Sequence, residues 1–204
     1  MESQSIMKIR NISMTYHTLD GEIETLKNID LDVNKGDIIT IVGPSGCGKS
    51  TLLSIIAGLV NPSKGEVFIN DKKVNGTNKD IGYMFQRDHL FEWRTIMGNV
   101  LIGLEIQDKV TDEKKKFAEK LLDTYGLEDF KNNYPNQLSG GMRQRVALIR
   151  TLAIEPEILL LDEPFSALDY QTRLAIADEI GTILKKEGKT ALMVTHDIAE
   201  AMSV

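Results

Sequence analysis

The sequence predicts an α/β protein in which a parallel-sheet core is interrupted by a helical insertion. Strand patterns alternate with helix patterns near both ends of the 204-residue chain, whereas the middle reads as a block of helices. A glycine-rich loop at residues 43–50 joins a predicted strand to a predicted helix. Short strands are predicted before this core, at the N-terminal end.

Strands and turns are predicted before the glycine-rich loop. Residues 8–16 partly alternate between apolar and polar side chains, and residues 31–33 precede a turn at residues 34–36. Residues 38–42 are a compact β-branched run, which is typical of a strand that is buried on both faces. We therefore expect this strand to belong to the buried core.

A helix and a hairpin are predicted after the loop. Residues 50–60 have helical spacing. Residues 66–70 and 72–74 have the pattern of two strands joined by a turn at Asn70 and Asp71.

The middle of the chain is predicted to be helical. Thr111 is typical of a helix N-cap, with Asp112 and Glu113 in the first turn, and Gly126 marks the end of the helix. The lysines at positions 114–116 are interpreted as the solvated side of this helix rather than as a binding patch. One apolar stripe runs along the helix: Phe117, Leu121, Leu122 and Tyr125.

The C-terminal part returns to alternating strands and helices. Residues 158–161 form an apolar strand, a helix is predicted to about residue 186, and residues 191–195 form another strand. This alternation indicates that the parallel core resumes after the helical block.

Composition disfavours several classes of protein. The chain has 30 acidic and 24 basic residues and a net charge of −6, which disfavours a general nucleic-acid-binding protein because such proteins need a basic face. Cys47 is the only cysteine, so an intramolecular disulfide is excluded and a reducing compartment is expected. Neither a signal-peptide pattern nor a run of about 18 apolar residues is visible. We expect a cytoplasmic protein that another subunit would hold at a membrane.

The loop at residues 43–50 matches the pattern G-x-x-x-x-G-K-[ST] in the strand-to-helix context that this motif requires. Its glycines allow several backbone N–H groups to converge on phosphate oxygens, and the following helix adds its positive N-terminal end. Lys49 can neutralise the terminal phosphates, and the Ser50 hydroxyl can ligate Mg²⁺. Cys47 is interpreted as a small filler rather than a reactive thiol. The predicted phosphate-binding residues are Gly43, Pro44, Ser45, Gly46, Cys47, Gly48, Lys49, Ser50 and Thr51.

Two acidic residues follow the apolar strand at residues 158–161. A carboxylate at the tip of a strand beside a phosphate loop can hold Mg²⁺ through its waters, which is the predicted role of Asp162. A carboxylate just beyond the strand can polarise an attacking water, so Glu163 is the predicted general base. Alone, this pattern could be an acidic turn after a strand; together with the loop it predicts a P-loop nucleotidase.

Residues 138–145 resemble the signature motif of the ATP-binding cassette (ABC) ATPases, and further motifs of this family occur in the family's order. By this resemblance Tyr16 stacks on adenine and Gln86 is the Q-loop glutamine. Asp169 belongs to the D-loop, and His196 is the switch histidine that contacts the γ-phosphate. Three of these residues have a simpler alternative: Tyr16 could be an ordinary strand aromatic, Gln86 a solvated loop residue and His196 a structural histidine. The fold that the resemblance implies is a P-loop NTPase (RecA-like) parallel-sheet core with an N-terminal antiparallel β subdomain and an inserted α-helical subdomain.

The resemblance also implies the ligands ATP and Mg²⁺ and a dimeric active form. Ser139, Gly140 and Gly141 open a predicted helix, so they offer a second anion site of hydroxyl, N–H groups and helix dipole. ABC ATPases hold ATP between the loop of one subunit and the signature of another, so one chain with one of each implies a homodimer. The implied catalytic residues are Lys49, Glu163 and His196, and the implied metal ligands are Ser50, Gln86 and Asp162.

The stretch after Gln86 is similar to that of the nitrate, sulfonate and taurine importers of the ABC family. Phe91 and Glu92 replace the usual Leu-Pro before Trp93, and an Asn-Val pair follows at Asn99. The resemblance implies a membrane permease that docks near the Q-loop, a solute-binding protein outside the cell, and a place on the cytoplasmic face of the membrane. Trp93 could line the docking groove or pack inside the helical insertion.

Two other classes of ABC protein share these motifs. An exporter of lipid or peptide would have every catalytic motif, whereas a non-transport ABC protein would carry a long coiled-coil insertion or two cassettes in one chain. The latter features are not visible in the sequence. We therefore expect the ATP-hydrolysing subunit of a bacterial importer for a small anion or a sulfonate-like solute.

The expected organisation is a single ABC ATPase domain over residues 1–204. Residues 1–87 and 155–204 are expected to form the nucleotide-binding core with its β subdomain, and residues 88–154 the helical subdomain. Family members continue beyond the switch histidine with further strands and a helical tail, so we expect the C-terminal part of the cassette to be missing from this chain.

Overall fold

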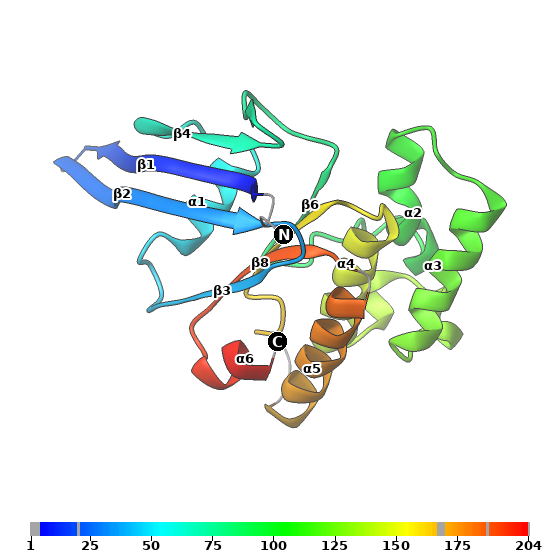
Figure 1. The fold of residues 1–204 in the computed structure, drawn as a ribbon. Coiled ribbons are helices and arrows are strands. Elements are labelled where there is room, and N and C mark those ends of the chain that lie inside the picture. Colours follow the sequence, from blue (N-terminus) through cyan, green and yellow to red (C-terminus); the bar gives the residue numbers. More distant parts are fainter. Residues whose placement is uncertain (1–4, 20, 167–169, 187, 204) are drawn as a thin grey trace.

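The computed structural model describes residues 5–19, 21–166, 170–186 and 188–203, which form two sheets with helices around them (Figure 1). The first sheet is antiparallel with the spatial order β2-β1-β4-β5: β1 Ser5–Thr18, β2 Gly21–Asn34, β4 Lys64–Ile69 and β5 Lys72–Lys73. The second sheet is parallel with the order β3-β8-β7-β6: β3 Ile38–Val42, β6 Ile81–Met84, β7 Ile158–Asp162 and β8 Thr190–Thr195. The predicted combination of an antiparallel β part and a parallel core is confirmed.

Helices connect the strands of the parallel sheet. Three of them, α2, α3 and α4, come between β6 and β7 in sequence and lie together on the side away from the antiparallel sheet (Figure 1). This arrangement confirms the predicted helical insertion. The described helices are α1 Lys49–Ile56, α2 Ile96–Ile106, α3 Asp112–Thr124, η1 Glu128–Phe130, η2 Pro135–Gln137, α4 Gly140–Ala153, α5 Tyr170–Lys186 and α6 Ile198–Ser203.

The parallel sheet separates two hydrophobic clusters. Along the central strand β7, Ile158 and Leu160 pack with the antiparallel sheet and α1, whereas Leu159 and Leu161 pack with the inserted helices and α5. All four side chains are at most 1% exposed, and they alternate because successive residues of a strand point to opposite faces. Both parts of the molecule are therefore packed on one sheet, whose strand ends have fixed positions.

The strand β3 differs from its prediction. Its residues are half-buried or exposed, and Val42 is 43% exposed, so the expectation of a strand buried on both faces is wrong. The reason is its place in the sheet: β3 is an edge strand that pairs with β8, whereas β7 and β8 occupy the centre and are buried along their whole length. A β-branched run indicates a strand but not its position in the sheet.

The helix α1 is shorter than predicted, because it ends at Ile56 rather than at residue 60. Gly58 adopts φ +71°, and a Cβ atom at this position would lie 2.0 Å from the carbonyl oxygen of Gly76. Only glycine allows so close an approach in this backbone conformation. The chain therefore leaves the helix early to pass against the segment that precedes β6.

Several local predictions are confirmed. Asn70 and Asp71 join β4 and β5 with φ angles of 50° and 58°, as a two-residue turn with left-handed backbone requires. The hydroxyl of Thr111 accepts a hydrogen bond from the backbone N–H of Lys114 at 3.2 Å and caps α3. Lys114 also forms an ion pair with Glu155, so this lysine is less solvated than predicted.

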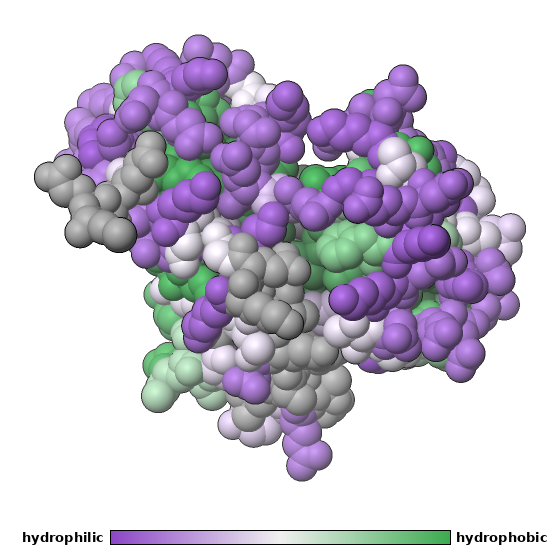
Figure 2. Space-filling view, turned by 45° about the vertical axis from the view of Figure 1, so that its right-hand side comes forward, coloured by the Kyte–Doolittle hydropathy of each residue, from purple (hydrophilic) through white to green (hydrophobic). Residues whose placement is uncertain are grey.

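The surface is mostly hydrophilic on the face that Figure 2 shows, where hydrophilic side chains cover two lobes and an apolar area lies between them. Within the part of the chain that the structure describes, no helix combines the length and the apolarity needed to cross a bilayer.

Candidate functional site

The glycine-rich loop connects the carboxyl end of β3 to α1. The backbone N–H of Gly43 donates to the carbonyl oxygen of Thr195 at 3.2 Å, which places the start of the loop beside the end of β8. Gly48 is the N-cap of α1 with φ 97°, and a Cβ atom there would lie 2.8 Å from the carbonyl oxygen of Thr25 in β2. This glycine therefore lets the loop turn into the helix while the antiparallel sheet packs against it.

Lys49 is buried by the loop that carries it. Its ammonium group donates to the carbonyl oxygens of Gly43 and Pro44 at 2.7 and 2.9 Å, and the residue is 7% exposed. These two hydrogen bonds offset part of the cost of burying the charge. The positive charge is thus held inside the loop, at the N-terminal end of a helix, which is an arrangement suited to an anion.

Ser50 and Asp162 meet at the ends of α1 and β7. The Ser50 hydroxyl donates to Oδ1 of Asp162 at 3.0 Å, and Asp162 is 4% exposed. Burial raises the pKa of this carboxyl group, while the hydrogen bond from Ser50 lowers it. A hydroxyl and a carboxylate are the oxygen ligands that Mg²⁺ prefers. Among the described residues, no group of three or more acidic, histidine or cysteine side chains is placed to hold a metal ion.

Glu163 is the residue around which the other polar groups gather. It has a positive φ of 46°, and its backbone N–H donates to the carbonyl oxygen of Val194 at 3.0 Å. Its Oε2 accepts a hydrogen bond from the amide of Gln86 at 3.0 Å and lies 3.3 Å from Nδ1 of His196, while Oε1 lies 3.9 Å from the Lys49 ammonium group. Strained backbone of this kind persists where the surrounding structure fixes it, and it is common at functional sites.

Of these residues, Lys49, Ser50, Gln86 and Glu163 line a hollow of about 230 Å³ beside the loop. The carboxylate of Glu163, the residue Lys49 and the backbone of the glycine-rich loop border the same small space. Such an arrangement can bind a phosphate group and polarise a water molecule next to it. The lining residues are Thr25, Ser45, Gly46, Gly48, Lys49, Ser50, Thr51, Gln86 and Glu163.

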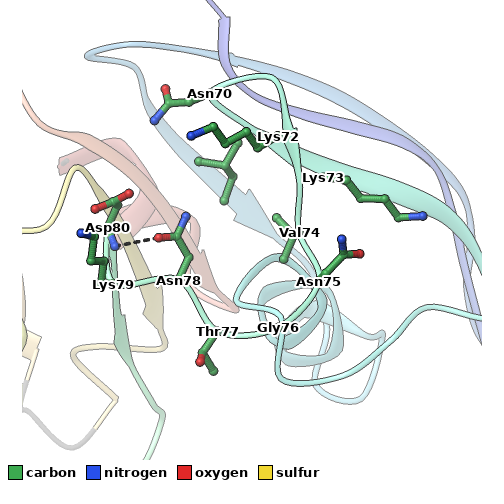
Figure 3. Close-up of a pocket in the computed structure, with 11 residues that line it drawn as sticks. Asn70, Lys72, Lys73, Val74, Asn75, Gly76, Thr77, Asn78, Lys79 and Asp80 are labelled. Atoms are coloured by element: carbon green, nitrogen blue, oxygen red, sulfur yellow. Dashed lines mark hydrogen bonds between the residues drawn. The ribbon is translucent and has the colours of Figure 1, made fainter.

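Another pocket, of about 530 Å³, lies elsewhere, along the segment from Ile69 to Asp80 (Figure 3). It shares no lining residue with the hollow at the loop. The Lys73 side chain extends away from the other labelled side chains (Figure 3) and forms an ion pair with Glu66. The groups needed for phosphate chemistry gather at the smaller hollow.

A family model described as ABC transporter matches residues 26–166. This chain belongs to the ABC transporter family. It is 50% identical to the uncharacterized ABC transporter ATP-binding protein YtlC of Bacillus subtilis. The alignment of 200 residues covers 98% of this chain and 77% of that protein.

Other relatives of this cassette have a named substrate. The taurine import ATP-binding protein TauB of Roseobacter denitrificans is 40% identical over 197 residues, covering 96% of this chain and 74% of that protein. The aliphatic sulfonates import ATP-binding protein SsuB of Bacillus cereus is 41% identical over 196 residues, covering 96% and 77%. A solved structure, the dimeric post-hydrolysis state of the ATP-binding cassette MJ0796 with ADP and Pi, matches with a TM-score of 0.85. At 38% identity it covers 96% of this chain and 90% of that chain.

Some predicted site residues of the cassette lie outside the hollow. Tyr16 is on β1, where it is 39% exposed and pairs with Ile23 of β2. It is not among the residues that line the hollow. Cys47 is an exposed free thiol of the loop. Asp169 lies outside the described residues.

The signature residues are at the exposed start of α4. The Ser139 hydroxyl accepts from the backbone N–H of Met142 at 3.3 Å and caps the helix, and Gly140 is exposed. None of Ser139, Gly140 and Gly141 lines the hollow of the same chain.

The cassette also contains site residues that the sequence did not reveal. Thr25 lines the hollow although it lies in β2, a strand distant in sequence from most of the other lining residues.

Thr195 holds the segment around His196. Its hydroxyl donates to the carboxyl group of Glu200, a residue that is 3% exposed. Burial raises the pKa of Glu200. The backbone N–H of Asp197 donates to the Thr195 hydroxyl at 3.0 Å. Thr195 thus fixes the backbone on both sides of His196, and no single-sequence pattern marks such a contact.

The segment between Gln86 and α2 exposes aromatic side chains. Trp93 is 75% exposed and its ring lies 5.1 Å from that of Phe91; packing of Trp93 inside the helical insertion is therefore excluded. Asn99, which is fully buried, accepts from the N–H of Phe91 at 2.7 Å and donates to its carbonyl oxygen at 3.1 Å. The aromatic pair is thus held at the surface by a buried amide.

Proposed function

We propose that this cassette binds and hydrolyses ATP with Mg²⁺ and couples this reaction to the uptake of a small solute. The observation that carries the proposal is the set of contacts made by Glu163, which joins Gln86, His196 and Lys49 at the phosphate loop. The hollow then holds a base, an amide and a cation, and the imidazole of His196 lies against the base; these are groups that phosphoryl transfer to water needs.

The residues divide into three roles in this reaction. Backbone N–H groups of the loop and Lys49 bind the phosphates, and Tyr16 stacks on the base of the nucleotide. Glu163 orients and deprotonates the attacking water, and His196 contacts the γ-phosphate. Ser50, Gln86 and Asp162 would hold Mg²⁺, which supplies charge neutralisation at the phosphates when bound.

The complete site would contain residues of two chains. Ser139 and Gly140 are exposed, Gly141 is half-buried, and all three lie outside the hollow of their own chain, so this helix start can contact nucleotide held by another copy. The solved structure of the related cassette MJ0796 is a dimer, which supports this arrangement. Asp169 is proposed to lie at the same interface, because its motif resembles the D-loop of the family. We propose a homodimer that ATP closes and that hydrolysis opens.

A membrane permease is the proposed partner of this dimer. Phe91 and Trp93 form the proposed contact surface, because an exposed tryptophan beside a second aromatic ring is typical of interface anchors. The cassette would then lie on the cytoplasmic face of the membrane, and a solute-binding protein outside the cell would deliver the cargo. The importer relatives for taurine and aliphatic sulfonates favour a sulfonate-like solute. Uptake of radiolabelled taurine by cells with and without this chain tests the solute class.

Glu163→Gln tests the chemistry. The amide cannot accept a proton but fills the same space, so steady-state hydrolysis should fall by at least about 100-fold, while ATP binding is retained. ATP should also favour a stable dimer of this variant in size-exclusion chromatography. The matched control is Glu119→Gln on α3, an exposed glutamate paired with Lys131. Wild-type turnover by Glu163→Gln would remove Glu163 from the role of base.

A further inference from the structure

The loop that follows Gln86 is attached to the signature helix α4 by side chains of that helix. Arg143 makes a double contact with Asp88, with Nε to Oδ2 at 2.9 Å and a terminal nitrogen to Oδ1 at 3.2 Å. The same guanidinium group lies 3.2 Å from a carboxylate oxygen of Glu92. Arg150, two turns further along α4, donates to the carbonyl oxygens of Asp88 and His89 at 2.6 and 2.8 Å.

A second connection reaches Gln86 itself. Gln144 is 4% exposed, and its amide donates to the backbone carbonyl oxygen of Gln86 at 3.3 Å. The side-chain amide of Gln86 in turn donates to Glu163 at 3.0 Å. A continuous series of hydrogen bonds therefore runs from α4 through Gln86 to the proposed base.

The charges favour this attachment. Burial alone would raise the pKa of Asp88, but the hydrogen bond from Arg143 and that from the Leu90 N–H hold it below its usual value. The same hydrogen bond to Asp88 raises the pKa of Arg143. The pair therefore stays ionised around neutral pH. A bidentate, partly buried pair is the kind of ion pair that fixes geometry, unlike a single exposed contact.

We propose that Arg143 and Gln144 are positioning residues for the active site: they fix the Gln86 loop on α4, the helix that Ser139 caps. The inference rests on the proposed function and goes beyond it by naming how the two anion sites communicate. Arg143 is one helical turn from Ser139, so a displacement of the start of α4 moves Asp88 and, with it, the backbone of Gln86. The occupant of the signature site on one chain thus acts on Glu163 of that same chain.

The proposal is tested by measuring ATPase kinetics of Arg143→Gln alone and in combination with Gln86→Ala. Arg143→Gln removes the bidentate contact and should lower kcat for ATP by about ten-fold while KM and the affinity for ATP stay unchanged, because the phosphate loop keeps its own contacts. If Arg143 acts through Gln86, the double variant Arg143→Gln, Gln86→Ala should be no slower than Gln86→Ala alone. Asp88→Asn should give the same effect as Arg143→Gln from the other side of the pair.

The control is Arg10→Gln, which removes an Arg–Asp pair between β1 and β2, where Arg10 contacts Asp32 at 2.6 Å. This variant should leave kcat unchanged, and all kinetics are measured below the melting temperatures of the variants. Wild-type kcat in Arg143→Gln, or multiplicative losses in the double variant, would overturn the positioning role. If Glu163→Gln also retains full turnover, the proposed function itself fails; if only the Arg143 results are negative, the inference alone fails.

Discussion

At the tip of β7, Asp162 is buried at 4% exposure and accepts a hydrogen bond from Ser50. Burial raises its pKa above the ordinary value of 3.8, so the folded protein holds the proton more tightly than the unfolded chain does. The stabilising contribution of this proton is complete below pH 3.8 and is lost as the pH rises through the raised folded pKa. At neutral pH the carboxylate therefore lowers the free energy of unfolding.

Asp162→Asn should accordingly raise the melting temperature at neutral pH, because it removes a charge that burial disfavours. The gain should shrink as the pH is lowered toward 3.8. Hydrolysis of ATP with Mg²⁺ should fall by about 100-fold in the same variant. Thermal unfolding and steady-state kinetics check both effects, and Asp123→Asn, an exposed carboxylate on α3, is the control. A lower melting temperature for Asp162→Asn would contradict the proposed cost of burial.

Among the elements, α3 was predictable because its boundaries are local. Thr111 caps the first turn through its own hydroxyl and Gly126 ends the helix with φ 66°, and neither contact needs the rest of the fold. The edge strand β3 was mispredicted since its burial depends on neighbours that are distant in sequence. The attachment of Asp88 to Arg143 was not predicted either, because these two residues are also distant in sequence. The site motifs themselves were recognisable, because phosphate binding requires particular residue types at fixed spacing.

Thr111→Ala should destabilise the molecule by about 1 kcal/mol through loss of this cap. Urea unfolding measures the change, with Thr77→Ala in an exposed loop as the control. Since α3 contributes no residue to the hollow at the phosphate loop, turnover should stay at the wild-type level. Equal stability of the two variants would show that the cap contributes nothing here.

For the whole molecule, the decisive question is whether each site is composed of two chains. Lys49→Ala and Ser139→Arg should each be inactive alone. In a mixed dimer of these two variants one site carries both changes and the other carries neither. Random mixing should therefore restore about a quarter of the wild-type rate, since half of the dimers are mixed and each has one intact site.

A mixture of Lys49→Ala with Glu163→Gln is the matched control, because both residues belong to the same half of the site and no intact site can form. Activity after mixing is measured as phosphate release at fixed total protein. Recovery in both mixtures, or in neither, would contradict the composite site.

The surface position of Trp93 has a further consequence. It is the only tryptophan of the chain and its side chain is 75% exposed. Tryptophan fluorescence of the whole protein therefore originates from one point, on the segment that connects Gln86 to α2. The molecule therefore carries an intrinsic fluorescent reporter, and the wavelength of its emission maximum records whether water or another protein surface covers that segment.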